Sequence, residues 1–329
     1  HDLDHAVFHI LGALVARHDH VAWIPGDQVA QRVLLLIRRR NAAAVGTESG
    51  DPSTLVITGY VAQDHRGVAT TLGRNGSDHS ASLFGALLDA AEIHIWTDVD
   101  GILSGDPRLV PEVAVMDSLS YSEAMELAYF GAKVIHPRTM APAIEHGIPL
   151  VIRNTFAPDA PGTRIAAASD GQDIKGITSI HGIALVNLEG AGMIGVPGTA
   201  MRVFAALRDA DISVVLISQA SSEHSICFAV PEDHVEAARA VLERAFRSEL
   251  DQGAIQDIGV TRDCSILAVV GDGMGGRPGI AAKVFGTLGE AGVNVRAIAQ
   301  GSSERNISAV IDKRDAPRAV RAVHAGFYL

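Results

Sequence analysis

A glycine-containing stretch, Thr70–Asp78, has residue types suited to holding a small anion. Its two inner glycines allow backbone amides to approach a ligand closely. Arg74 between them can form charge-assisted, bidentate bonds with a carboxylate or a phosphate. Ser77 and Asp78 stand where the following helix is expected to start, and an aspartate there can simply compensate the helix dipole. The stretch therefore predicts either an anion site or ordinary helix-start chemistry.

A second polar stretch, Trp96–Arg108, follows a predicted strand. Ligands of open parallel sheets bind beyond the carboxyl ends of the strands, which is where Thr97 and Asp98 would lie. Turn formation explains the Asp-Gly and Asp-Pro steps of this stretch well. It explains Thr97, Asp98 and Arg108 less well.

A third stretch, Phe130–Pro137, contains a lysine just after a predicted helix. Lys133 could cap the last carbonyls of that helix. It could instead neutralise charge on a phosphoryl group during transfer.

Two glycine patterns imitate other nucleotide sites. Gly271, Gly273 and Gly276 have the spacing of a dinucleotide fingerprint, and the same spacing starts at Gly190. That fingerprint needs an acidic residue about 20 residues later, and Asn294–Gln300 has none. A Gly-x-x-x-x-Gly-Lys-Ser/Thr run is also missing, which excludes a P-loop. The glycines are better explained as tight turns at helix starts, whose amides suit a carboxylate.

Composition limits the classes of partner. The net charge is −11 and the densest basic run is Arg38–Arg40, so no nucleic-acid partner is expected. Cys227 and Cys264 are not spaced as metal ligands, and no metal site is predicted. No apolar run is long enough to span a membrane, and no signal peptide is visible, so a cytoplasmic location is expected.

Strands and helices are predicted to alternate, which is typical of parallel βαβ units. Ser120 and Glu123 form a predicted capping box, and Gly131 a helix end. Helix-like patches occupy 1–15 and 30–45, and a linker is expected between 158 and 172. The other elements expected are strands at 54–59, 93–97 and 148–154 and helices at 81–91 and 122–130.

The second half of the chain contains an internal repeat. Gly192–Gly198 returns as Gly273–Gly279, and Gln219–Glu223 returns as Gln300–Glu304, each 81 residues later. Each copy predicts a strand, a glycine-proline turn, an amphipathic helix and two further strands. The copies predict two α+β modules at 175–255 and 256–329.

Together, the three polar stretches and the repeat resemble the aspartokinase family, most closely its threonine-sensitive branch that is fused to homoserine dehydrogenase. The resemblance covers residues from about 53 to 329. It implies an α/β amino-acid kinase fold in residues 1–165, with a mainly parallel sheet and helices on both faces, followed by two ACT-type modules. It also implies transfer of the ATP γ-phosphoryl group to L-aspartate with Mg²⁺, in the biosynthesis of threonine, lysine and methionine.

The resemblance also implies roles for individual residues. Arg74 and Ser77 would hold aspartate, and Asp78 would organise a catalytic lysine. Gln219 and Gln300 would sense an effector, threonine or lysine, and the ACT modules would form a homo-oligomer. The nucleotide site would be lined by Thr97, Asp98, Leu103, Arg108, Lys133 and Val134, with Lys133 also catalytic.

The sequence departs from the family pattern at its start. Such kinases open with a Lys-Phe-Gly-Gly-Thr-Ser loop that is not found here, and no dehydrogenase region follows. A protein of only these residues is therefore expected to be inactive. The alternatives are an amino-acid-binding regulatory fragment, or a kinase of the same fold with another substrate.

Overall fold

The computed structural model describes residues 7–10, 59–63, 68–131, 135–219, 221 and 223–328. The described residues of 1–103 and 115–171 form one compact unit, and those of 104–114 and 172–329 form a second one. The predictions for 30–45, for the strand at 54–59 and for Arg38–Arg40 lie outside the described residues. Among the residues described, no helix is both long and apolar enough to cross a bilayer.

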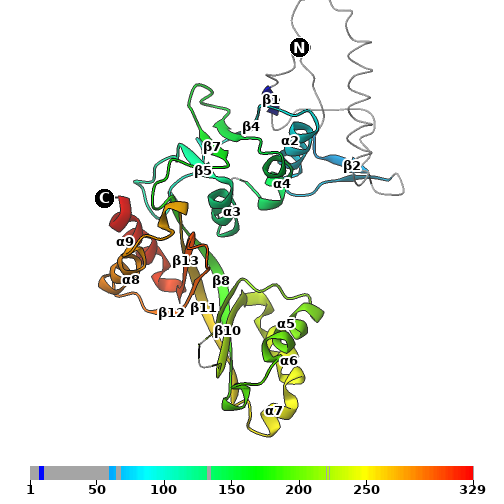
Figure 1. The fold of residues 1–329 in the computed structure, drawn as a ribbon, viewed down its shortest axis with the longest axis vertical. Helices are drawn as coiled ribbons and strands as arrows, with labels where there is room; N and C mark the ends of the chain where they lie inside the picture. The colour runs from blue at the N-terminus through cyan, green and yellow to red at the C-terminus, as the bar shows by residue number, and fades with distance from the viewer. Residues whose placement is uncertain are drawn as a thin grey trace, which may run out of the picture. The chain divides into compact units, whose positions relative to one another are not determined.

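The first unit contains a five-stranded sheet in the order β1-β4-β6-β7-β5, drawn in blue to green in Figure 1. All its neighbouring strands are parallel except β6 and β7, which fits the predicted mainly parallel sheet. Its strands are β1 (Val7–Ile10), β4 (Glu92–Thr97), β5 (Ser118–Ser120), β6 (Leu150–Asn154) and β7 (Thr163–Ala166). A small antiparallel hairpin of β2 (Val61–Gln63) and β3 (Ala69–Thr71) precedes the helices.

The helices of the first unit within the described residues are α2 (Gly76–Leu87), α3 (Tyr121–Tyr129) and α4 (Pro137–Glu145). The predicted capping box is confirmed, because Glu123 N donates to Ser120 Oγ at 3.0 Å and Ser120 N donates to Glu123 Oε2 at 2.7 Å. Helix α2 begins at Gly76, one residue before Ser77, so the predicted helix start at Ser77 and Asp78 is confirmed, although the predicted range 81–91 begins too late. The loop residues therefore lie against the first turn of a helix.

Two local predictions were wrong. Residues 7–10 lie in a patch expected to be helical but form β1, because β4 offers them a parallel partner. The expected linker contains β7, whose Ile165 is fully buried between β6 and β5. In both cases a long-range partner strand, which local sequence does not reveal, decides the conformation.

The second unit contains a six-stranded antiparallel sheet in the order β12-β13-β11-β8-β10-β9. Two long strands run through it, β8 (Gly176–Glu189) and β11 (Asp257–Val270). Figure 1 shows α5 and α6 beside one end of these strands and α8 and α9 beside the other. The remaining elements are β9 (Leu216–Gln219), β10 (Ser225–Pro231), β12 (Val295–Gln300), β13 (Asn306–Asp312), α5 (Thr199–Asp209), α6 (Val235–Ala245), α7 (Arg247–Asp251), α8 (Ile280–Glu290) and α9 (Ala316–Tyr328).

The two repeats are interleaved in this sheet. The end of β8 pairs with β10, while the start of β8 pairs only with the end of β11, opposite β13. Register shifts between Thr261 and Ile266 separate the two halves of β11. Each half of the sheet therefore contains one strand segment from the sequence that was predicted to form the other module. The predicted module boundary at 255/256 lies just before β11, which contributes to both halves.

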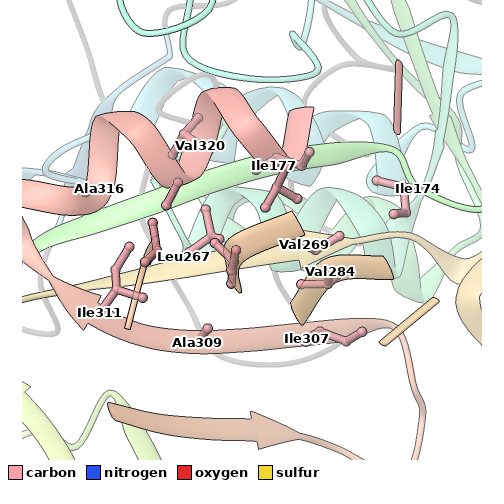
Figure 2. Close-up of a cluster of buried hydrophobic side chains, with 14 of the residues drawn as sticks. Ile174, Ile177, Leu267, Val269, Val284, Ile307, Ala309, Ile311, Ala316 and Val320 are labelled. Carbon is pink, nitrogen blue, oxygen red and sulfur yellow. The ribbon is translucent and has the colours of Figure 1, made fainter. Parts of the chain in front are cut away.

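Segment 104–114 belongs to the second unit although the strands on either side of it belong to the first. Ser104 Oγ lies 3.1 Å from Nε2 of the buried His324 in α9. Val110 lies in the core formed by β8, β11, β13, α8 and α9. Figure 2 shows that core, in which Val320 of α9 lies over strands that carry Ile177, Leu267 and Ile311. Burying Val110 ties a segment from the first half of the sequence to the second module.

Candidate functional site

The glycine loop makes a tight turn at the start of α2. Gly73 and Asn75 both have left-handed backbone conformations, with φ of 75° and 60°. Asn75 O accepts from His79 N at 3.1 Å, so the helix begins there. Gly76 N donates to Gly73 O at 3.1 Å, whereas the next amides of α2 have no intrahelical acceptors and suit an anion. Arg74 is exposed and lies within this turn.

Asp78 and Ser77 occupy the first turn of α2, half-buried. Burial raises the pKa of the Asp78 carboxyl above its ordinary value, against the lowering effect of hydrogen bonds from Asn75 and Ser77. Both bonds are long, at 3.4 Å. Asp78 is therefore a weakly satisfied carboxylate that would gain from a cationic partner.

The turn before β2 is hydrogen-bonded to the glycine loop and to the first turns of α2. Tyr60 has a left-handed φ of 72°, and its amide donates to Ser80 Oγ at 2.9 Å. Ser80 Oγ in turn donates to Gly76 O at 2.9 Å, and Leu72 N donates to Tyr60 O at 2.9 Å. A Cβ on Gly76 would lie 2.7 Å from Leu72 Cβ and 3.0 Å from the Tyr60 ring. Glycine is required here because two neighbours fill the space of a side chain.

Replacing Gly76 with alanine is expected to destabilise the protein by about 1–3 kcal/mol, because the added methyl overpacks the loop. The free energy of unfolding in denaturant is the measurement. Gly286→Ala is the matched control: among the described residues, nothing beyond the neighbouring backbone of α8 lies within 4 Å of its Cβ position, so alanine should be neutral or stabilising. Equal stability of the two variants would contradict this account of the loop.

The second polar stretch lies where β4 ends. Thr97 is the last residue of β4, and its Oγ1 donates to Asp98 Oδ1 at 3.1 Å. Asp98 is exposed and Leu103 is half-buried. Since α2 ends just before β4 begins, the helix runs back along the sheet and its first turn points toward this same edge. The sequence therefore places the glycine loop and the end of β4 on one side of the first unit.

The remaining residues predicted to line the nucleotide site either belong to the second unit or lie outside the described residues. Arg108 lies on segment 104–114 of the second unit, where its guanidinium is exposed and bonded to Asp106 at 2.7 Å. Hydrogen bonds from Arg108 lower the pKa of Asp106. Lys133 and Val134 lie outside the described residues. Arg108 would have to leave Asp106 in order to bind a phosphate.

Sequence reasoning missed a polar group on the neighbouring strand, β6. Asn154, the last residue of β6, faces Thr97 in the parallel register. Its Nδ2 donates to Asp100 Oδ1 at 2.6 Å. The only sequence signal was its position at a strand end.

A second candidate site lies in the first repeat. A pocket of about 340 Å³ lies between the start of α5 and the end of β9. It is lined by the glycine-proline turn at 195–199, by the predicted sensor Gln219 and by the apolar side chains of Met193 and Ile226. Glu223 also lines it and accepts a hydrogen bond from Gly195 N at 3.1 Å. Backbone amides, a side-chain amide and an apolar wall suit a small amino acid.

The second repeat places Gln300 in the equivalent position but has different surroundings. Gln300 pairs with Ile307 as Gln219 pairs with Ile226, and Glu304 accepts from Gly276 N at 2.5 Å. Arg277, however, forms an ion pair with Asp173, and Arg305 forms one with Asp272 at 2.8 Å.

The residues 81 positions before Arg277 and Arg305 are Val196 and His224. The first pocket therefore has a more apolar rim, and Val196 is half-exposed on it. The two repeats share the same backbone arrangement around Gln219 and Gln300, but the charged residues around these two positions differ.

Comparisons with known proteins match both halves of the chain. A model of the amino acid kinase family matches residues 24–154, and an ACT domain model matches 186–246 and 267–327. The chain is 49% identical over 290 residues to a chloroplastic bifunctional aspartokinase/homoserine dehydrogenase of Daucus carota, covering 85% of this chain and 32% of that protein. It therefore spans about one third of the length of such relatives.

Solved structures agree with the sequence relatives. The aspartate kinase of Clostridium acetobutylicum superposes with a TM-score of 0.74 at 29% identity, covering 83% of this chain and 62% of that one. E. coli aspartokinase III in complex with aspartate and ADP superposes with a TM-score of 0.73 at 28% identity, covering 92% and 64%. Both halves therefore match one architecture, an amino acid kinase fold with ACT domains.

Proposed function

The chain belongs to the aspartate kinase family, with an amino acid kinase region followed by ACT domains, and we propose from this premise that it transfers the γ-phosphoryl group of ATP to the β-carboxylate of L-aspartate. The observation that carries the proposal is the glycine loop, in which Arg74 and Asp78 stand at the start of α2. A cation and free amides there fit the α-carboxylate of aspartate. Asp78 fits its ammonium group or a catalytic lysine.

The roles of the residues follow from what phosphoryl transfer needs. Such a transfer is catalysed mainly by positioning and by neutralising charge. Arg74 and Ser77 orient aspartate, and Thr97, Asp98, Leu103, Arg108 and Val134 bind the nucleotide. Lys133, the only lysine before residue 175, neutralises the transferring group. The donor set also fits Mg²⁺, which binds carboxylates together with substrate phosphates, because Asp98 is an exposed carboxylate at the end of β4.

The second unit regulates this activity in our proposal. The pocket at Gln219 binds an amino-acid effector, and threonine is favoured over lysine because Glu223 is the only carboxylate that lines the pocket among the residues that the structure describes. Glu223 is already bonded to the Gly195 amide, so it is poorly placed to bind the ammonium group of lysine.

The chain is proposed to form a homo-oligomer through the ACT modules, which could pair at their sheet edges. The two edge strands also contact each other within the chain, where Ser218 Oγ of β9 donates to Ile298 O of β12 at 2.9 Å. The cytoplasm, where ATP and aspartate are both found, is the proposed location.

The proposal is tested by assaying the full-length protein for ATP-dependent formation of aspartyl phosphate, trapped with hydroxylamine. Aspartate should be phosphorylated and glutamate should not, since the loop sets one distance between carboxylate and phosphate. A preference for another amino acid would support the alternative of a related kinase. Amino-acid binding without any phosphorylation would support a regulatory protein.

A protein of these 329 residues alone is expected to show no measurable aspartate phosphorylation. The sequence holds four lysines and no glycine-rich lysine loop, so one of the groups that neutralise the developing charge is missing. The assay should use a sample whose mass confirms the chain. Robust turnover by that sample would mean that Lys133 suffices.

A further inference from the structure

The turn that follows β6 lies beside the loop that follows β4. The two strands are parallel neighbours, with Thr97 opposite Asn154, so both end at the same edge of the sheet. The pairing continues one residue further, because Thr155 N donates to Thr97 O at 2.8 Å. Residues 155–156 therefore leave the sheet next to Asp98.

Asn154 joins the two loops with both ends of its side-chain amide. Nδ2 donates to Asp100 Oδ1 at 2.6 Å, and Oδ1 accepts from Phe156 N at 2.8 Å. An ionised carboxylate only accepts hydrogen bonds, so Asp100 sets the orientation of the amide. A charge-assisted bond of this length is stronger than a neutral one. Asn154 thereby fixes the position of the Asp98–Asp100 loop relative to the turn.

Phe156 has a fixed backbone and an exposed ring. The turn is closed by Ala157 N donating to Asn154 O at 3.2 Å and by Ala160 N donating to Ala157 O at 3.0 Å. Nearby, Arg153 lies over the Trp96 ring and donates to Pro158 O at 3.3 Å. Phe156 is nevertheless 83% exposed, more than any other large apolar side chain in the described part of the chain. A hydrogen-bonded turn that presents a flat apolar ring to solvent is suited to binding a flat partner.

We propose that this turn completes the nucleotide site, with Phe156 stacking on the base and Asn154 acting as a positioning residue for the Asp98–Asp100 loop. The inference rests on the proposed function, because that function places the nucleotide at Thr97 and Asp98. The occupant follows from the register: Thr155 N donates to Thr97 O, so the turn that carries Phe156 starts beside Asp98, where the nucleotide is proposed to bind. Aromatic side chains stack on any nucleobase face.

The test of Phe156 compares steady-state constants of the full-length enzyme and its variants. Phe156→Leu should raise KM for ATP roughly tenfold, the usual size of one lost base stack, while KM for aspartate stays unchanged. Phe156→Tyr keeps a ring and should restore the parental KM. Inhibition by tripolyphosphate, which has no base, should be the same for all three proteins.

The control for this test is Tyr129→Leu, which removes another half-exposed aromatic ring elsewhere in the first unit. It should leave KM for ATP unchanged. A parental KM for ATP in Phe156→Leu would overturn the stacking role. An equal loss of ATP and tripolyphosphate binding would do the same, because it would show general damage to the loop.

The test of Asn154 is a double-mutant cycle with Asp100. Asn154→Ala and Asp100→Ala should each raise KM for ATP several-fold, and the double variant should be no worse than either one. Asp100→Asn still offers an acceptor and should be close to the parent. Additive effects, or an equal rise in KM for aspartate, would overturn the positioning role.

The outcomes separate this inference from its premise. A parent enzyme that forms no aspartyl phosphate and binds no ATP would remove the premise and this inference with it. A parent that is active, with variants that keep the parental KM for ATP, would overturn this inference alone.

Discussion

Replacing Arg74 with alanine is expected to lower kcat/KM for aspartate in the full-length enzyme by at least about 100-fold. The physical reason is the loss of a charge-assisted, bidentate bond to the substrate carboxylate at the start of α2. Because Arg74 is exposed in the glycine loop, its removal should leave the fold intact. The measurement is steady-state kinetics with aspartate varied at saturating ATP.

Two controls make the Arg74 result specific. Arg74→Lys keeps the charge but not the fork, so it should recover only part of the lost kcat/KM. Arg208→Ala removes another exposed arginine, paired with Asp209 at 2.7 Å on the second unit, and should be neutral. Near-normal kinetics of Arg74→Ala would reject the assignment of the loop to aspartate.

Threonine binding is expected to fall by at least about 100-fold when Gln219 is replaced with alanine. Gln219 lines the pocket together with the helix-start amides of α5, and its amide can bond the ligand's hydroxyl or amino group. For the same reason valine should bind at least about 100-fold more weakly than threonine, since it would leave the amide of Gln219 unpaired. Isothermal calorimetry with threonine, valine and lysine is the measurement.

Gln300→Ala is the matched variant in the second repeat. Its surroundings carry the ion pairs of Arg277 and Arg305, which the first pocket lacks, so a weaker effect on threonine binding is expected. Tight lysine binding without a threonine signal would reject threonine as the effector. No heat with any amino acid would count against a sensor.

The calorimetry needs the whole chain. A fragment that starts at residue 170 would lose segment 104–114 and with it Val110, which is 3% exposed in the core beside α8 and α9. Removing this side chain would leave a cavity, at a cost of about 2–4 kcal/mol. A failure of that fragment to bind threonine would therefore not test Gln219.

Local features of the first unit were predictable because neighbouring residues determine them. The capping box at Ser120 depends on residues three positions apart, and the structure confirms it. The glycine loop could be located for a similar reason, since its turn needs the left-handed Gly73 directly before a helix. The site residues at Arg74, Asp78, Thr97 and Asp98 were found by their positions at element ends, and their roles stay proposals.

The sequence did not predict which distant strands and side chains pair with each other. A repeat 81 residues long predicted two modules, but not that β8 and β11 would each serve both of them. The bond between Asn154 and Asp100 joins residues 54 positions apart, and the contact between Ser104 and His324 joins residues 220 positions apart. In both contacts, the residues next to each partner give no indication of which distant residue it will meet.

What the sequence by itself determined is the capping box, the glycine turns and the apolar periodicity of the helices and strands, because these depend on residues a few positions apart. The tertiary structure alone decided which strands are neighbours, and therefore which polar side chains meet. Strand pairing depends on where each strand can bury its two faces and find a hydrogen-bonding edge, which is a property of the whole chain. That is why Arg108 belongs to the second unit, and why Asn154 reaches Asp100 beside the end of β4.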